Sequence, residues 1–452
     1  MNFSVDSNGG FKNIIITLDG TAGSGKSTTA SMLAGRLNMK YLNTGSMYRA
    51  VTYAVLREGI DPEDEERVSE LAERINLDLV DVDGNRELFL NGRNIEKEIR
   101  QASVSAAVSP VSRHKSVRAE MVRLQREIAG NGGVVAEGRD LGTVVFPHAQ
   151  VKLYLVADIE ARVKRRAAQL KSMGIELGED RIRKNIQERD RIDSTRQVSP
   201  LLKPPGARVI DTSGLTIYQQ VDEAENYARQ RAEKLATRKK SYLNEKSSFF
   251  FTRYFRVSSR LIFWLCRLLF GLRVLGGENL KTGGNFLFAS NHISYADPPV
   301  VGCALNREIW FLAKKELFLN RFFGWLIRKY HAVPIDRESF DRKAIRYIVK
   351  LLKSGHSVLM FPEGTRSRDN RIKMPKVGLG YIALNAGSDI IPVYVKGSGR
   401  LLSALFRREK LEVRIGPPIF IDSDYKPEDR KKDYRLIASM VFESIKMLKY
   451  EM

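Results

Sequence analysis

Short apolar runs alternate with helix-like segments along the first half of the chain. The β-branched run NIIITL at 13–18 is followed by a glycine-rich loop and by a helical pattern over 26–37. Further apolar runs at 134–136 and 151–156, and a last one near 207–211, predict additional buried strands. Strands that alternate with helices in this way are typical of a parallel α/β sheet.

Two stretches of the first half follow other patterns. Residues 77–95 alternate polar and apolar positions and carry glycine turns at 83–84 and 91–92, which predicts a small antiparallel insert. Residues 160–196 are helical in pattern and rich in arginine, and a last helix is expected from about Ile217 into the 230s. We therefore expect one α/β domain over 1–235.

A second alternation of strands and helices follows a polar, basic stretch at 234–248 that has no periodicity. We predict a linker at 236–248 and a second α/β domain at 278–452. A chain of 452 residues also exceeds what one hydrophobic core usually supports, and the two halves share no motif. The candidate strands of the second domain are 285–290, 309–313, 331–335, 357–361, 390–395 and 411–415.

The segment 249–277, between the linker and the second domain, combines apolar and basic residues and contains no acidic one. On a helix, four of its arginines fall within about 60° of one another, while Phe, Trp and Leu cover much of the remaining circumference. These arginines are Arg253, Arg256, Arg260 and Arg267. The pattern favours an amphipathic helix that contacts an anionic membrane surface; the alternative is a buried helix whose arginines face solvent. No run of about 18 uncharged apolar residues occurs, so we expect no membrane-spanning helix.

The net charge of +22 is compatible with nucleic acid, an anionic membrane or anionic substrates as partners. No nucleic-acid-binding motif is present, so we expect no nucleic-acid partner and assign the charge to nucleotide, phosphoester and membrane contacts. A basic patch at 405–410 adds to that surface. The two cysteines, Cys266 and Cys303, form no disulfide framework, and no signal-peptide pattern is visible. We expect a cytoplasmic protein, peripherally attached to the inner face of the membrane.

The sequence GTAGSGKS at 20–27 fits the phosphate-loop pattern G-x-x-x-x-G-K-[ST]. Its glycines let backbone N–H groups face the phosphates, Lys26 neutralises phosphate oxygens, and the Ser27 hydroxyl suits Mg²⁺. The loop lies between a predicted strand and a predicted helix, whose N-terminus adds a positive dipole end. We therefore predict a bound nucleoside triphosphate. The predicted contacts are Gly20, Thr21, Ala22, Gly23, Ser24, Gly25, Lys26, Ser27 and Thr28.

Three further segments follow the phosphate loop at domain-scale spacing: LNTGSMYRA at 42–50, VVAEGRDLGTVVFP at 134–147 and ERDRIDSTR at 188–196. With these motifs the first half closely resembles cytidylate kinase, a nucleoside monophosphate kinase. The resemblance implies that ATP, with Mg²⁺, phosphorylates CMP or dCMP to the diphosphate. No catalytic base is needed, because the acceptor is already an ionised phosphate.

The resemblance also assigns roles to individual residues. Catalysis of phosphoryl transfer needs cations that offset charge repulsion, and Lys26, Arg139 and Arg189 match these. Arg49 and Arg139 match the arginines on the acceptor phosphate, Arg189 and Arg196 those of the lid, and Asp193 the ribose contact. The remaining substrate-binding candidates are Arg118 and Asp140 on the cytosine edge, Ser109 by spacing, and Thr44. A paired cation and carboxylate would reject uracil by leaving buried polar groups unpaired.

The second half contains the segment SNHISYADP at 290–298, with a histidine and an acid in His-x₄-Asp spacing. Three segments follow it in order: one from FLAKKELF to VPIDR at 311–337, FPEGTRSR at 361–368 and IIPVYVKGS at 390–398. Together they resemble the glycerolipid acyltransferases, specifically the 1-acylglycerol-3-phosphate acyltransferases, from about residue 275 to 400. We see no metal cluster in this half.

In that family the histidine that matches His292 is the general base, which takes the proton of the acceptor hydroxyl as it attacks an acyl thioester. The acid that matches Asp297 holds the imidazole in the needed tautomer, and Asn291 is a candidate for positioning the pair. The segment that matches Glu363, Gly364, Thr365 and Arg366 binds the acceptor phosphate, and Arg337 is a further substrate-binding candidate. The acyl donor is acyl-CoA or acyl-carrier protein.

The sequence thus predicts a bifunctional enzyme that makes CDP from CMP and phosphatidate from lysophosphatidate. Three alternatives stay open: an acyltransferase for another lysophospholipid, a hydrolase or transacylase, and a half that binds without catalysis. The presence of Lys26, Arg139, His292 and Asp297 argues against the last.

Overall fold

The computed structural model describes residues 4–450, with gaps at 6–10, 83–84, 131, 173, 197, 246–252, 283, 336–341, 368–370, 401–409 and 423–424. The chain divides into two compact units, residues 2–234 and 235–452. Helix α8 (Ile217–Glu245) begins in the first unit and ends in the second.

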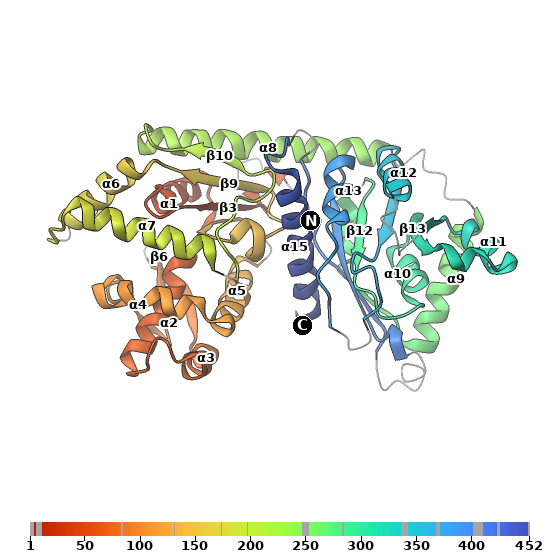
Figure 1. Cartoon of the computed structure of the whole chain (residues 1–452), viewed down its shortest axis with the longest axis horizontal. Coiled ribbons are helices and arrows are strands. Elements are labelled where there is room, and N and C mark those ends of the chain that lie inside the picture. Colours follow the sequence, from red (N-terminus) through yellow and green to blue (C-terminus); the bar gives the residue numbers. More distant parts are fainter. Residues whose placement is uncertain are drawn as a thin grey trace. The chain divides into compact units, whose positions relative to one another are not determined.

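A five-stranded parallel sheet forms the centre of the first unit, in the order β10-β9-β3-β8-β4. One face packs on Leu33 of α1 and Ala228 of α8, and the other packs on Met47 of α2 and Met121 of α5, so helices cover both faces (Figure 1). The strands are β3 (Ile15–Gly20), β4 (Lys40–Asn43), β8 (Val134–Gly138), β9 (Val151–Val156) and β10 (Arg208–Asp211).

The first unit also contains helices, short helical turns and strands outside the central sheet. Its helices and short helical turns are α1 (Lys26–Arg36), α2 (Thr44–Arg57), α3 (Glu65–Arg74), η1 (Glu98–Arg100), α4 (Ala102–Arg113), α5 (Lys115–Ala129), η2 (Leu141–Val145), α6 (Ile159–Ser172) and α7 (Glu179–Thr195). The expected antiparallel insert is confirmed as β5 (Leu77–Val82), β6 (Asn85–Leu90) and β7 (Arg93–Asn94). Strand β1 (Ser4–Val5) pairs antiparallel with β2 (Phe11–Lys12).

A seven-stranded sheet forms the centre of the second unit, in the order β11-β17-β16-β12-β15-β13-β14. Every pair in it is parallel except β16 with β17. The strands are β11 (Arg273–Leu275), β12 (Leu287–Ser290), β13 (Ile309–Lys314), β14 (Ala332–Ile335), β15 (Ser357–Met360), β16 (Ile390–Lys396) and β17 (Glu412–Ile415).

Helices cover both faces of this second sheet. Ile348 of α12, Leu379 of α13 and Ile437 of α15 share one core cluster, while Cys266 of α9 and Val301 of α10 belong to the cluster on the opposite face. The helical segments are α9 (Arg253–Phe270), η3 (Gly277–Thr282), α10 (Asp297–Leu305), η4 (Lys315–Phe318), α11 (Arg321–Lys329), α12 (Arg342–Lys353), α13 (Gly378–Ala386), η5 (Ser398–Arg400) and α15 (Arg430–Tyr450).

Two expectations about the region that joins the units need correction, and one strand of the first unit was not predicted. Residues 236–245 of the expected linker 236–248 are helical, because α8 continues to Glu245, while 246–248 lie outside the described residues. The expected membrane-contact segment 249–277 extends too far, because residues 273–275 form strand β11 and pair with β17. Strand β4 was not predicted at all, since its sequence KYLN is short and polar at both ends.

The paths of the described helices bear on whether the chain could cross a membrane. None of them is long and apolar enough to span a bilayer. In α9 the exposed Arg260 and Arg267 interrupt the apolar sequence.

Candidate functional sites

The loop between β3 and α1 has the backbone that a phosphate-binding loop needs. Gly20 has φ 151°, and a Cβ there would lie 2.1 Å from the Leu155 carbonyl oxygen, so only glycine fits against β9. Gly25 is left-handed, with φ 89°, and caps α1. The Thr21 hydroxyl is buried and has no hydrogen-bond partner in the described part of the chain, which leaves it available to a phosphate oxygen.

Lys26 lies buried at the base of this loop. Its Nζ donates to the Thr21 carbonyl at 2.6 Å. Burial lowers the pKa of Lys26, and the positive charge of Arg139 lowers it further. A phosphate would supply the negative charge that favours the protonated amine, so the site is built for an anion.

Two buried acids border the loop, and sequence reasoning assigned neither. Glu137, at the end of β8, accepts from the Ser27 hydroxyl at 2.8 Å and from the Tyr41 hydroxyl at 2.8 Å. Asp19, on β3, accepts from the backbone N–H groups of Leu141 and Gly142, and burial raises its pKa to about 6. Both acids could have been found from the sequence, because each lies near the carboxyl end of a strand.

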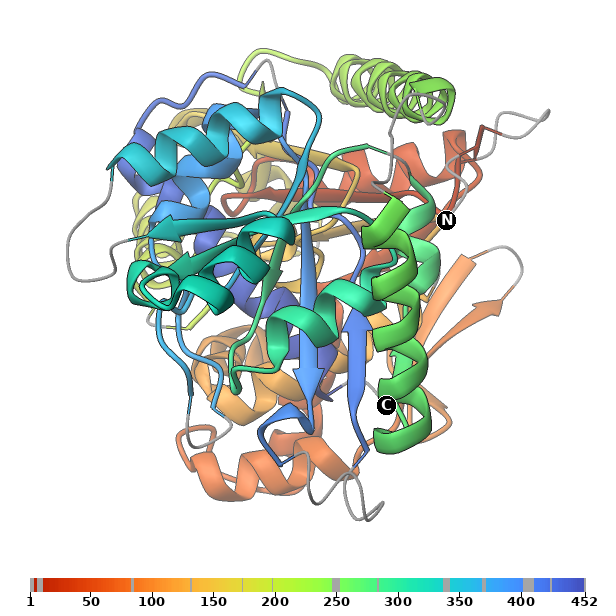
Figure 2. The ribbon, with the colours of Figure 1, turned by 90° about the vertical axis from the view of Figure 1, so that its right-hand side faces the viewer.

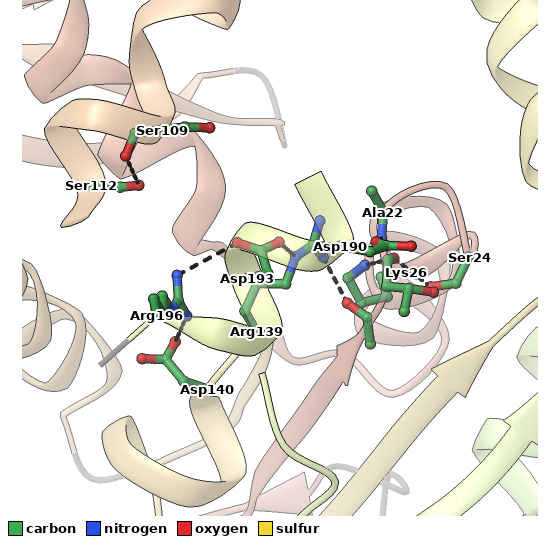
Figure 3. A network of polar contacts seen from close by, with 12 residues as sticks. Ala22, Ser24, Lys26, Ser109, Ser112, Arg139, Asp140, Asp190, Asp193 and Arg196 are labelled. Atoms are coloured by element: carbon green, nitrogen blue, oxygen red, sulfur yellow. Dashed lines mark hydrogen bonds and ion pairs between the residues drawn. The ribbon is translucent and has the colours of Figure 1, made fainter. Parts of the chain in front are cut away.

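A cluster of arginines extends from the loop toward α7 (Figure 3). Arg139 donates from Nη1 to the Gly20 carbonyl and from Nε to Asp193, each at 2.8 Å. Arg196 lies 3.6 Å from Asp193. Burial lowers the pKa of Arg189 to about 10, and the nearby Arg139 contributes to that shift. Cations from α7 and from the residues that directly follow β8 and α7 therefore gather in one region, with Asp193 as a shared acidic partner of Arg139 and Arg196.

The two residues expected to read the base form a buried ion pair. Arg118 of α5 pairs with Asp140, and Arg118 also lies 5.3 Å from the centre of the Tyr48 ring. Asp140 in turn lies 4.0 Å from Arg196, which connects this pair to the arginine cluster. Ser109 lies apart on α4, and the hydroxyl of Ser112 donates to its carbonyl (Figure 3).

The remaining sequence-predicted residues of this unit lie on α2. Arg49 donates to the Ser105 hydroxyl at 2.9 Å, and the Thr44 hydroxyl donates to the Glu137 carbonyl at 2.8 Å. Asp190 of α7 was not predicted: it accepts from the Ala22 N–H at 3.3 Å. One backbone N–H of the phosphate loop thus donates to a carboxylate of the protein itself.

The second site lies where β12 ends. His292 Nδ1 lies 2.7 Å from Asp297 Oδ2, and both side chains are buried. The N–H groups of Ile293 and Ser294 donate to the same oxygen at 2.7 and 2.8 Å, and the Ser398 hydroxyl donates to the other. Because a carboxylate only accepts hydrogen bonds, Nδ1 carries the imidazole proton and the Nε2 lone pair is available as a base.

Three contacts fix the histidine loop to its neighbours. Asn291 donates to the Val395 carbonyl at 3.0 Å and accepts from the Val395 N–H at 2.7 Å, which fixes the loop to β16. The His292 ring stacks on Phe361, with 4.2 Å between ring centres. The Ser367 N–H donates to the His292 carbonyl at 2.8 Å. Residues 290–298 and 361–367 therefore lie together at one site.

Glu363 lies inside this site rather than at its edge. One carboxylate oxygen accepts from the His292 N–H at 3.2 Å, and the other is buried without a hydrogen-bond partner in the described ranges. Burial raises the pKa of Glu363 to about 7. Gly364 follows with φ 75°, and a Cβ there would lie 2.6 Å from the Lys376 side chain. Thr365 is exposed beyond this turn.

Arg366 is exposed and lies over the ring of Tyr295, 3.6 Å from its centre. Sequence reasoning missed Tyr295 and Ser398, although both lie within segments already singled out. Arg337 and most of the basic patch 405–410 lie outside the described residues. Neither in this unit nor in the first do the described residues include a cluster of three metal-ligating side chains.

The first unit has the strand, glycine loop and helix of a P-loop phosphotransferase, with arginines gathered beside the loop. Residues 16–230 match the family model of cytidylate kinase. A cytidylate kinase of Limosilactobacillus reuteri is 42% identical over 50% of this chain and 99% of its own length, and one of Enterococcus faecalis is 44% identical over 48% and 96%. The chain belongs to the cytidylate kinase family through its first half.

The second unit is an α/β acyltransferase domain, since residues 271–396 match the acyltransferase family model. A crystal structure of the 1-acyl-sn-glycerophosphate acyltransferase of Thermotoga maritima aligns at 23% identity over 47% of this chain and 89% of that chain, with a TM-score of 0.35. The chain is therefore a fusion of a kinase with an acyltransferase.

The raised pKa of Glu363 predicts a pH dependence of stability. Between about pH 4.5 and 7 Glu363 binds more protons in the folded unit than in the unfolded chain, so its contribution to stability falls as pH rises. In Glu363→Gln this loss should be smaller. All three tryptophans lie in the second unit, so urea unfolding followed by tryptophan fluorescence at about pH 5 and about pH 8 measures it.

The matched control for this measurement is Glu278→Gln, at an exposed acid of the same unit. It should keep the wild-type dependence. An equal pH dependence in wild type and Glu363→Gln would contradict the account.

Proposed function

We propose that the first unit transfers the γ-phosphate of ATP to CMP or dCMP. The observation that carries this is the line of charged groups from Lys26 through Arg139 and Asp193 to the buried Arg118–Asp140 pair. The loop would hold the donor phosphates, and Arg139, Arg189 and Arg49 would face the transferred and accepting phosphates. These cations offset the repulsion between two anions, which is the main requirement of phosphoryl transfer.

The residues around Ser27 fit the expected magnesium ion. The Ser27 hydroxyl and the Glu137 carboxylate offer oxygen ligands 2.8 Å apart, and Mg²⁺ prefers oxygen ligands. When bound, the ion would neutralise charge on the donor phosphates. The lid arginines Arg189 and Arg196 would close over the phosphates, and Asp193 would accept hydrogen bonds from the ribose hydroxyls.

For the second unit we propose acyl transfer from a thioester to the sn-2 hydroxyl of 1-acylglycerol-3-phosphate. His292 Nε2 takes the hydroxyl proton while the oxygen attacks the thioester carbonyl. Asp297 holds the Nδ1 proton and stabilises the imidazolium that forms. The proton then passes to the leaving thiolate, which yields phosphatidate and a free thiol of coenzyme A or acyl-carrier protein.

Arg366 supports a phosphorylated acceptor. Its guanidinium is exposed beside the His292 loop, and such a group binds a phosphate monoester by paired hydrogen bonds. The Arg366 guanidinium could equally bind the phosphate of another lysophospholipid. Such a lysophospholipid is the alternative acceptor. A hydrolase would need the site to admit water in place of the alcohol.

We further propose that α9 attaches the second unit to the inner face of an anionic membrane. Val257, Leu261, Trp264 and Leu268 are exposed along one side of the helix, opposite the buried Phe255 and Cys266. The exposed Arg260 and Arg267 lie beside that apolar side and would meet lipid phosphates. A membrane-bound acyltransferase reaches a lipid acceptor without extracting it fully into water.

The proposed reading of cytosine predicts a change of nucleotide preference. In Asp140→Asn the charged acceptor for the cytosine amino group is lost, so kcat/KM for CMP should fall roughly 10- to 150-fold. The kcat/KM for UMP should change much less, so the preference of the enzyme for CMP over UMP becomes smaller. ADP formation with each nucleotide measures both, and unchanged acyl transfer by the same variant is the control. An equal loss with CMP and UMP would count against this role.

The stacking of Arg366 on Tyr295 predicts a separation of KM from kcat. Tyr295→Leu removes the aromatic face, so KM for lysophosphatidate should rise roughly 2- to 30-fold while kcat changes little. Tyr295→Phe keeps the face and should behave as wild type. Acyl transfer to a monoacylglycerol, which has no phosphate, should be insensitive to either change. A similar loss in both variants, or a loss confined to kcat, would refute the positioning role.

A further inference from the structure

Helix α11 exposes an unusual amount of apolar surface for a short helix. Leu319, just before it, is 81% exposed, and Phe322, Trp325 and Phe323 are 73%, 55% and 42% exposed. Only its inner side, with Gly324 and Ile327, is buried. Exposed aromatic groups in such a row mark an interaction surface, because monomeric proteins rarely leave contiguous apolar patches in water.

The charged residues of α11 itself are all positive, and the turn η4 before it carries the exposed Lys315 and Glu316. Arg321, Arg328 and Lys329 are exposed, and α11 contains no acidic residue. Arg328 lies 5.3 Å from the centre of the Phe318 ring, and Lys329 lies 6.0 Å from that of Trp325. Aromatic side chains beside cations suit the boundary between acyl chains and anionic head groups.

Helix α9 is also rich in aromatic and basic residues, and its first turn lies near the end of α11. The Phe255 ring, in the first turn of α9, lies 5.9 Å from the Tyr330 ring and 6.1 Å from the His331 ring, and these two residues directly follow α11. Figure 2 shows both helices on the side of the unit turned toward the viewer. Each carries one exposed tryptophan, Trp264 on α9 and Trp325 on α11. Tryptophan favours the membrane interface, where its ring is apolar and its N–H stays hydrated.

We propose that α11 is a second membrane-contact element, and that the residues Leu319–Lys329 bind an anionic bilayer together with α9. The inference extends the proposed membrane attachment and rests on it. Two contacts separated along the unit would fix its orientation on the membrane, which a single helix cannot do. They would also fix the position of the His292–Asp297 site relative to the membrane, because α10 starts at Asp297 and packs against α9.

The occupant of the surface is a lipid bilayer because both helices combine apolar rows with positive charge alone. A second copy of this basic surface would place like charges against one another, which costs free energy. An anionic membrane instead attracts each cation near its surface.

Tryptophan quenching tests the proposal on the full chain. Trp264→Phe leaves Trp325 as the exposed tryptophan, Trp325→Phe leaves Trp264, and the double variant leaves only the half-buried Trp310. We expect vesicles of brominated phosphatidylcholine and phosphatidylglycerol to quench both single variants and to leave the double variant nearly unquenched. Urea unfolding followed by far-ultraviolet circular dichroism checks that the second unit of each variant is folded.

The outcomes separate this proposal from the one on which it rests. Quenching in Trp325→Phe but not in Trp264→Phe would overturn the role of α11 and leave the attachment by α9 standing. Quenching in neither single variant would overturn both.

A binding measurement gives a second test. Phe322→Ser should weaken vesicle binding roughly tenfold or more, because it removes one large side chain from the apolar phase. Tyr218→Ser, at a similarly exposed aromatic residue of α8, should leave binding unchanged. Unchanged vesicle binding in Phe322→Ser, or wild-type self-association in solution that this variant abolishes, would contradict the proposal.

Discussion

Charge compensation around converging ionisable groups is the constraint on which both sites depend. In the second unit four donors meet on the Asp297 carboxylate: His292 Nδ1, two backbone N–H groups and the Ser398 hydroxyl. A buried carboxylate needs such partners, because an unpaired charge is costly away from water. The hydrogen bonds to this carboxylate orient the imidazole and hold the loop 292–294 against the first residue of α10. The contacts that orient the imidazole are therefore also contacts that hold the local fold together.

The first unit meets the same constraint with the signs reversed. Arg139, Arg189 and Arg196 converge with Asp193 and Asp140 as their acidic partners, and burial lowers the pKa of Arg189 and Arg196. Asp193 and Asp140 compensate part of this positive charge. In the proposed function, the phosphates of donor and acceptor would bring further negative charge beside these arginines.

The sequence predicted the order of most strands and helices, and contiguous motifs singled out many of the residues that the structure brings together, because such motifs carry their own spacing. The loop at 20–27 and the segments 290–298 and 361–368 are examples. Contacts between distant segments could not be read in this way. Glu137 reaches Ser27 across 110 positions, and Ser398 reaches Asp297 across 101. The helical continuation of α8 through a basic, aperiodic stretch was missed because its sequence has no apolar face to signal a helix.

The central claim is that one chain carries two independent active sites. Its most direct test is to assay the full-length wild type, Lys26→Ala and His292→Ala for ADP formation with CMP and for acyl transfer to lysophosphatidate. The account predicts that Lys26→Ala loses the first activity and keeps the second, while His292→Ala does the reverse. Loss of both activities in either variant would contradict two independent sites.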